Sequence, residues 1–322
     1  MKKLYFIPAV LCLLLAFCFC SNKAGDSPKP EPIEMEHYPI PIEQIQGRDP
    51  FVYADEESKT YYLTFRNNPH FKMYSSKDLK NWKDEGNVFT ANADFWGKQD
   101  FWAPDLYRYE DKYYIFATFS ALPSVNRGTS ILVANEVTGP YKPLVNHAVT
   151  PSEWMSLDGS LFIDDEDKPW IIFCKEWLQA IDGEIYAQQL TADLKETEGE
   201  PLLLLNASAA PWTNPIQSGD ITGYVTDAPF LYKTDDGKLQ MIWSSFDKNG
   251  KYAIGIAESE SGTLAGPWKH LSEQLNNDDG GHAMIFTGFD GNKYISYHTP
   301  NGYPEKPKIT RIKEANGTIV IL

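Results

Sequence analysis

The chain has 322 residues, of which 44 are acidic and 29 basic, so its formal net charge at pH 7 is −15. This excess of negative charge repels nucleic acid phosphates and anionic lipid surfaces, and it excludes nucleic acid as a partner. Of the four cysteines, only Cys174 lies far from the N-terminus. Disulfides therefore do not hold the domain together, and a hydrophobic core must do so, for which about 280 residues are sufficient.

The first 20 residues have the pattern of a lipoprotein-type signal peptide. Two lysines precede an apolar stretch that ends at Phe19 and is short for a membrane span, which needs about 20 apolar residues. Cys20 follows and resembles the lipidated cysteine of bacterial lipoproteins, with Cys18 nearly as suitable and an ordinary cleaved signal as the alternative. We therefore expect an exported protein of a bacterial envelope, facing the periplasm or the cell surface, that contacts the membrane only through an N-terminal lipid anchor.

Residues 21–44 are rich in proline and glutamate, a composition that cannot build a core and predicts an extended tether. From 45 to 322 the sequence consists of short alternating or apolar runs separated by turn residues, such as TYYLTF, KYYIFATF, KPWIIF and KLQMIW. The sequence predicts a single all-β domain over residues 45–322.

Five segments of this domain share one pattern: an acidic or imidazole side chain, a short apolar run, a turn and a second strand. They begin at Asp49, Asp105, Asp158, Asp227 and His282, spaced 56, 53, 69 and 55 residues apart. Matched units of about 40 to 50 residues are typical of propeller blades, whereas a β-sandwich would not repeat in this way. We predict a five-bladed β-propeller with four-stranded antiparallel blades around a central channel, where the five side chains would share one pocket.

The same segments resemble the motifs of glycoside hydrolase family 43. The matching runs, in family order, are GRDPFVY from Gly47, FWAPDLY from Phe101, LDGSLFIDD from Leu157, TDAPFLYKTDDGKLQMIWSS from Thr226 and GGHAMIF from Gly280 followed by YISYH. The resemblance implies a five-bladed propeller that hydrolyses arabinosides and xylosides with inversion at the anomeric carbon. It also implies a neutral oligosaccharide or polysaccharide as the partner.

The resemblance assigns three catalytic carboxylates: Asp49 as general base, Asp158 as the group that orients the acid and raises its pKa, and Asp227 as general acid. An inverting glycosidase needs such a base and acid on either side of the scissile bond. Asp227 departs from the family, which usually has Glu-Gly-Pro where this chain has Asp-Ala-Pro. Because catalysis is sensitive to displacements of about 1 Å, Glu176 and Glu184 are kept as reserve candidates for the acid.

Six further residues are candidates for substrate binding: Arg66, Trp102, Asp105, Trp177, Phe246 and His282. Aromatic rings stack on sugars, and the Arg66 guanidinium donates hydrogen bonds to hydroxyls, although core packing or a surface ion pair is an alternative for each. The chemistry requires no cofactor. The resemblance leaves open a structural calcium ion in the channel, contacted by His282 through water, but calcium prefers oxygen ligands and a hydrogen-bonded histidine is favoured.

The leading hypothesis is a glycosidase that removes pentose residues from plant-type polysaccharides or oligosaccharides, as an α-L-arabinofuranosidase first and a β-xylosidase next. One alternative is a non-catalytic glycan-binding propeller on the cell surface, which the aspartate in place of glutamate makes conceivable. Another is a related glycosidase that acts on galactosides or fructosides. The released sugar distinguishes the three.

Overall fold

The computed structural model describes residues 39–123, 126–315 and 317–322. The predicted signal peptide, 1–20, and most of the predicted tether, 21–44, lie outside the described residues. Strand β1 (Ile40–Pro41) falls within the predicted tether but pairs with the outer edge of the first sheet, so the domain begins earlier than residue 45. Within the described ranges, no helix has the length and apolar character needed to cross a membrane.

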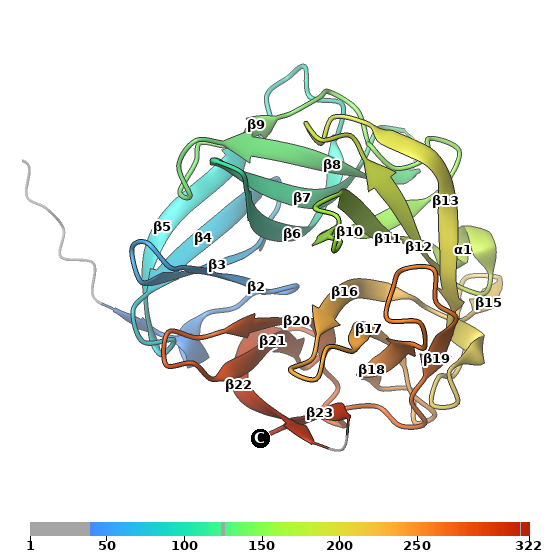
Figure 1. Ribbon diagram of the computed structural model, residues 1–322. Coiled ribbons are helices and arrows are strands. Elements are labelled where there is room, and N and C mark those ends of the chain that lie inside the picture. The colour runs from blue at the N-terminus through green and yellow to red at the C-terminus, as the bar shows by residue number, and fades with distance from the viewer. Residues whose placement is uncertain (1–38, 124–125, 316) are drawn as a thin grey trace, which may run out of the picture. The chain divides into compact units, whose positions relative to one another are not determined.

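Five antiparallel sheets form the blades of a β-propeller around a central channel (Figure 1), which confirms the predicted fold class. Blade 1 consists of β2 (Phe51–Asp55), β3 (Thr60–Asn67), β4 (His70–Ser76) and β5 (Asn81–Thr90), with β1 added at its edge. Blade 2 consists of β6 (Gln99–Tyr109), β7 (Lys112–Ser120), β8 (Arg127–Ala134) and β9 (Lys142–Pro143).

The remaining blades follow the same order of strands from the channel outward. Blade 3 consists of β10 (Ser156–Ile163), β11 (Pro169–Lys175), β12 (Glu184–Leu190) and β13 (Thr197–Asn206). Blade 4 consists of β16 (Asp227–Lys233), β17 (Leu239–Phe246), β18 (Tyr252–Ser259) and β19 (Trp268–His270). Blade 5 consists of β20 (Gly281–Thr287), β21 (Lys293–Thr299), β22 (Lys306–Ala315) and β23 (Thr318–Ile321).

In every blade one residue near the start of the inner strand has a left-handed backbone conformation, and uninterrupted pairing with the second strand begins two positions after it. These residues are Asp49, Ala103, Asp158, Ala228 and His282, with φ between 46° and 58°. They are the true structural equivalents of one another. The spacing in the sequence predicted Asp105 and Asp227 as the equivalents of Asp49. That prediction was wrong, because Asp105 lies two residues after the true equivalent in blade 2 and Asp227 lies one residue before it in blade 4.

Counted between the true equivalents, the repeat becomes more even, with spacings of 54, 55, 70 and 54 residues. The one long interval contains additional structure between blades 3 and 4. Its elements are the short helix α1 (Trp177–Ala180), the 3-10 turn η2 (Ala207–Ala209) and a hairpin of β14 (Ile216–Ser218) and β15 (Ile221–Gly223). Trp177 and Ile216 from this interval line the pocket in the channel, so the longer interval contributes two residues to the pocket wall.

Every junction between neighbouring blades carries a hydrogen bond made by a buried serine or threonine hydroxyl. The five bonds are Thr64 Oγ1 to Pro104 O (2.7 Å), Asp158 N to Thr118 Oγ1 (2.9 Å), Ser160 Oγ to Pro229 O (2.5 Å), His282 N to Ser244 Oγ (2.9 Å) and Ser296 Oγ to Pro50 O (3.0 Å). They satisfy backbone groups of the inner strands that the sheets leave unpaired near the strand starts. We call these five bonds the hydroxyl ring.

Candidate active site

A pocket of about 300 Å³ lies at the end of the channel where the inner strands begin. It contains eight of the nine predicted site residues, namely Asp49, Arg66, Trp102, Asp158, Trp177, Asp227, Phe246 and His282. They come from all five blades, as the propeller hypothesis predicts: most stand near the starts of inner strands, Arg66 and Phe246 at the ends of second strands, and Trp177 at the start of α1. Asp105 does not line this pocket but a much smaller cavity beside Phe51 and Phe230, where its carboxylate accepts a hydrogen bond from the Tyr107 hydroxyl at 3.2 Å.

His282 lies between two of the carboxylates. Its Nδ1 is 3.2 Å from Asp49 Oδ1 and 3.7 Å from Asp158 Oδ2. Arg48 approaches Asp49 from another side, with its Nε 3.4 Å from the same oxygen. The Asp49 backbone N–H donates to Nδ1 of His298 at 3.3 Å, which fixes the strained turn that presents the carboxylate.

The environment of Asp49 holds its pKa below the usual value for an aspartate. Burial alone would raise this pKa, but His282, Arg48, His298 and Arg66 together outweigh that effect. Burial lowers the pKa of His282, and it lowers that of His298 to about 3, so at neutral pH the two arginines supply the lasting positive charge. Asp49 is therefore ionised at neutral pH and is able to accept a proton.

Asp158 and Asp227 have the opposite electrostatics. Burial, followed by repulsion from Asp227 and Asp49, raises the pKa of Asp158 well above its usual value. Burial raises the pKa of Asp227 to about 7, although the Tyr252 hydroxyl and Arg48 act against it. The two carboxyls titrate as one coupled pair, because each charge disfavours the other, and such a pair retains a proton near neutral pH.

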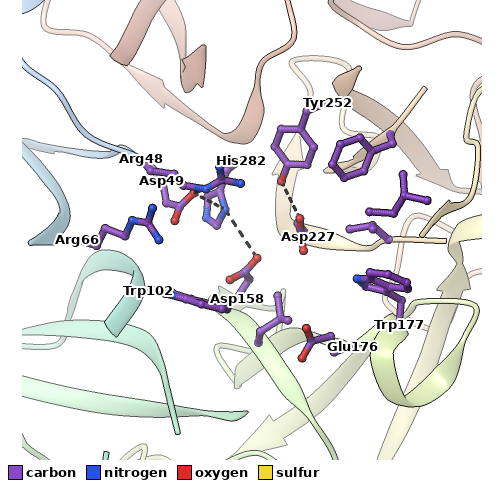
Figure 2. Close-up of a pocket in the computed structure, with 14 residues that line it drawn as sticks. Arg48, Asp49, Arg66, Trp102, Asp158, Glu176, Trp177, Asp227, Tyr252 and His282 are labelled. Atoms are coloured by element: carbon purple, nitrogen blue, oxygen red, sulfur yellow. Dashed lines mark hydrogen bonds and ion pairs between the residues drawn. The ribbon is translucent and has the colours of Figure 1, made fainter. Parts of the chain in front are cut away.

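Two hydrogen bonds hold this pair in place. The backbone N–H of Ala228 donates to Asp158 Oδ2 at 3.0 Å, and the Tyr252 hydroxyl donates to Asp227 Oδ2 at 2.9 Å. Figure 2 shows Asp49 and Asp227 on opposite sides of the pocket, with Asp158 between them. Asp49, with its lowered pKa, thus shares the pocket with two carboxyls whose pKa values are raised, and such a separation of pKa values is what activation of water and protonation of a leaving group require.

Glu176, a reserve candidate for the acid, also lines the pocket, but it is held by Arg127. Its Oε2 is 2.6 Å from Arg127 Nη1, and Arg127 Nε is 3.1 Å from Asp100 Oδ2. The Arg127 guanidinium also lies 4.5 Å from the centre of the Trp102 ring. Burial raises the pKa of Glu176 above its usual value, although Arg127 acts against this. Because Glu176 is bound directly to a guanidinium, it is better placed to fix Arg127 beneath Trp102 than to donate a proton.

The second reserve candidate, Glu184, does not line the pocket. It pairs with Lys175 at 3.1 Å and accepts a hydrogen bond from Tyr186. Three residues that contact the candidate catalytic aspartates were not predicted as part of the site: Arg48, Tyr252 and His298. Arg48 and His298 do stand within the quoted motifs, next to Asp49 and at the end of YISYH, whereas nothing in the local sequence marks Tyr252 on the third strand of blade 4.

The chemistry of the donors around His282 does not favour calcium. His282 Nδ1 already contacts Asp49, and calcium requires six to eight oxygen ligands. Among the residues that the structure describes, no group of three or more histidine, cysteine, aspartate or glutamate side chains is arranged to hold a metal ion.

The chain is similar in sequence and fold to known glycoside hydrolases. The model of the family described as "Glycosyl hydrolases family 43" matches residues 38–317. The crystal structure of an endo-arabinase from Bacteroides thetaiotaomicron is 57% identical, covers 88% of this chain and 100% of its own, and has a TM-score of 0.86. An extracellular exo-alpha-(1->5)-L-arabinofuranosidase of Cellvibrio japonicus is 24% identical over 84% of both chains. An extracellular endo-alpha-(1->5)-L-arabinanase of Bacillus subtilis is 24% identical over 65% of this chain and 63% of its own.

Proposed function

Because the chain belongs to family 43 of the glycosyl hydrolases, we propose that it cleaves α-L-arabinofuranosyl linkages in plant-type polysaccharides or oligosaccharides, with inversion. The observation that carries this proposal is the separation of the carboxylate pKa values within one pocket. The pKa of Asp49 is lowered, whereas that of Asp227 is raised to about 7. The choice of an arabinose sugar is supported by the names of the three relatives, each of which refers to arabinan or arabinofuranoside cleavage.

In this mechanism Asp49 removes a proton from water as the water oxygen attacks the anomeric carbon. The bond from that carbon to the leaving oxygen breaks, and the proton of Asp227 passes to the leaving oxygen. Asp158 accepts the Ala228 N–H beside Asp227 and so orients the acid, and repulsion between the two carboxylates favours a state in which one of them keeps its proton. The single displacement from the opposite face inverts the anomeric configuration.

Aromatic side chains at the mouth of the pocket fit the apolar faces of a sugar. Trp102 is the best supported of these, because Arg127 covers one face of its ring and holds it in place. Trp177 and Phe246 also line the pocket, as does Arg66, whose guanidinium would donate hydrogen bonds to hydroxyls. The neutral charge of the proposed substrate suits a pocket that already holds several carboxylates.

We also propose that the protein is exported and anchored through a lipid at Cys20 or Cys18. Two of the relatives are named extracellular, which supports export. The cysteines themselves lie outside the described residues, and mass spectrometry of the mature N-terminus would test the lipid.

The substrate is tested by incubating the protein with arabinan, arabinoxylan, xylan and galactan oligosaccharides and identifying the released sugars. Release of arabinose or arabino-oligosaccharides is expected. Release of xylose or galactose instead would contradict the proposed sugar, and tight binding without any release would favour a non-catalytic propeller. The lengths of the products would also distinguish cleavage at chain ends from internal cleavage.

The roles of Asp49 and Asp227 are tested by comparing a natural oligosaccharide with a dinitrophenyl arabinofuranoside, whose leaving group needs no proton. We expect Asp227→Asn to lower kcat/KM about 10²- to 10⁴-fold on the oligosaccharide and much less on the dinitrophenyl substrate. Asp49→Asn should impair both substrates, since water must be activated in either case. Equal losses in Asp227→Asn on the two substrates would contradict its assignment as the acid.

A further inference from the structure

A second pocket of about 440 Å³ lies on the blade 2 side of the catalytic pocket. Its walls include Trp96, Asn126, Arg127, His147, Ser152 and Trp154, and we call it the rim pocket. The mechanism above uses none of these residues except Arg127, which holds Trp102.

The rim pocket opens on the same face of the propeller as the catalytic pocket. Asn126 and Arg127 stand at the start of β8, which pairs with the end of β7, and the end of β7 pairs with the start of β6. His147, Ser152 and Trp154 lie in the connection that leads from β9 to the start of β10. The starts of β6 and β10 carry Trp102 and Asp158, so both pockets lie at the same ends of blades 2 and 3.

Only one layer of side chains separates the two pockets. Arg127 lines the rim pocket and is 2.6 Å from Glu176 and 4.5 Å from the Trp102 ring, and both of these partners line the catalytic pocket. A ligand that passes over this layer therefore reaches from one pocket into the other without crossing a blade.

The chemistry of the rim pocket suits uncharged sugar units. Two indole side chains, Trp96 and Trp154, provide apolar surface, and His147, Asn126 and Ser152 provide polar groups. No acidic residue is among the described residues of its wall, and the charge of Arg127 is balanced by Asp100 and Glu176. An anionic ligand would find no free positive charge there, whereas a sugar would find aromatic faces and hydrogen-bonding groups.

We propose that the rim pocket binds further sugar units of the same glycan chain whose scissile linkage lies in the catalytic pocket. This inference rests on the proposed function, since it takes the substrate to be a chain of neutral sugars. The pocket makes the enzyme sensitive to chain length: long substrates occupy both pockets, and a simple aryl glycoside occupies only the catalytic one.

The test measures kcat/KM on arabino-oligosaccharides from disaccharide to octasaccharide and on an aryl arabinofuranoside. The variant Ser152→Trp fills the rim pocket, and it retains the bond in which the Ser152 backbone carbonyl accepts from Asn126 at 2.9 Å. The variant Trp154→Ala removes an aromatic wall instead. In both variants, kcat/KM on the longest chains should fall about tenfold, whereas kcat/KM on the aryl glycoside should stay close to the wild-type value.

The matched control is Thr263→Trp, which places the same bulky side chain in a pocket formed by the turn between β18 and β19 and the turn between β10 and β11. That pocket lies at the opposite ends of the blades, so Thr263→Trp should behave as wild type on every chain length. An unchanged length dependence in Ser152→Trp, or an equal loss on all substrates, would overturn the proposal.

The outcome is separable from that of the proposed function. If no arabino-oligosaccharide is cleaved, the proposed function fails. Binding is then measured by calorimetric titration of the protein with the same arabino-oligosaccharides and with oligosaccharides of whichever polymer the protein does cleave. Weaker binding of long chains by Ser152→Trp than by wild type would support the rim pocket. Equal affinities would overturn it.

Discussion

Asp227 reaches the pocket from a different backbone position than Asp49 and Asp158 do. The left-handed residue of blade 4 is Ala228, with φ at 50°, so Asp227 precedes the position that its two counterparts occupy. The same turn directs the Ala228 N–H to Asp158 Oδ2. A left-handed alanine costs about 1 kcal/mol or more, and here the strained turn joins the proposed acid to the carboxylate that controls its proton.

Tyr252 opposes the raised pKa of Asp227, because its hydroxyl donates to Asp227 Oδ2 and so stabilises the ionised form. Tyr252→Phe removes this bond and should raise the pKa of Asp227 further. A general acid must be protonated, so activity falls as pH rises through this pKa. The alkaline limb of the profile of kcat/KM against pH should therefore move to higher pH, by about one unit.

A matched control for this variant is Tyr297→Phe. Tyr297 is equally buried, and its hydroxyl donates to Asp278 at 2.9 Å, outside the catalytic pocket. Tyr297→Phe should leave the alkaline limb in place. A limb that stays fixed or moves to lower pH in Tyr252→Phe would contradict the assignment of Asp227.

At the scale of the elements, the hydroxyl ring connects the stability of the blades to the position of the catalytic groups. Two of its five bonds end on the backbone N–H of a residue in the pocket, Asp158 or His282. The others end on proline carbonyls near the strand starts. Loss of one such bond leaves a buried backbone group without a partner.

Thr118→Val removes the acceptor of the Asp158 N–H and should lower the free energy of unfolding by about 1–3 kcal/mol. It should also lower kcat, since Asp158 is no longer held beside Asp227. The control is Thr64→Val, which breaks the equivalent bond to Pro104 and should cost similar stability. Chemical denaturation and kinetics on both variants check this, and equal effects on kcat would contradict a positioning role for Thr118.

The sequence predicted the blades better than it predicted the register of their inner strands. Strand runs and turns repeat along the chain, and this pattern depends only on local composition. A register shift of one or two residues at a strand start leaves that composition unchanged. For this reason the sequence alone did not distinguish Asp105 and Asp227 from true equivalents of Asp49. The left-handed residue that defines the position is alanine in blades 2 and 4, which carries no signal of its own.

The partners of the catalytic residues were harder to predict because they are distant in sequence. His298 accepts from the N–H of Asp49 although 249 residues separate them, and Tyr252 reaches Asp227 from the third strand of its blade. Their positions follow from the closure of the ring and the packing of its strands. Eight of the nine predicted residues nevertheless line the pocket, and five of them belong to the quoted motifs, because the starts of inner strands must converge on the channel.

At the scale of the whole propeller, side chains close the ring between its first and last blades. Blade 1 contains only β1–β5 and blade 5 only β20–β23. Tyr61 stacks on Phe289 at 4.3 Å between ring centroids, and the Tyr61 hydroxyl accepts from the Phe289 N–H at 2.8 Å. Gly47 N donates to Glu305 O at 3.1 Å across the same junction. Asp49 also stands at this junction, where its backbone N–H donates to His298 of blade 5.

Tyr61→Ala should lower the free energy of unfolding by about 3 kcal/mol, because it removes a buried ring from the closing junction. Tyr61→Phe retains the ring and should cost about 1 kcal/mol through the lost hydrogen bond. Tyr303→Ala provides the control, since Tyr303 is 85% exposed and should have little effect. Urea denaturation measures all three, and a Tyr61→Ala protein as stable as Tyr303→Ala would contradict closure by side chains.

The most direct test of the proposed division of labour between Asp49 and Asp227 is the configuration of the sugar at the moment of release. Proton NMR recorded immediately after mixing the protein with an α-linked arabinofuranoside identifies the first anomer formed, before mutarotation. If Asp49 activates water opposite the bond that Asp227 protonates, the first product is the β-anomer. An α-anomer formed first would mean that a carboxylate attacks the sugar directly, and it would contradict the roles proposed for both residues.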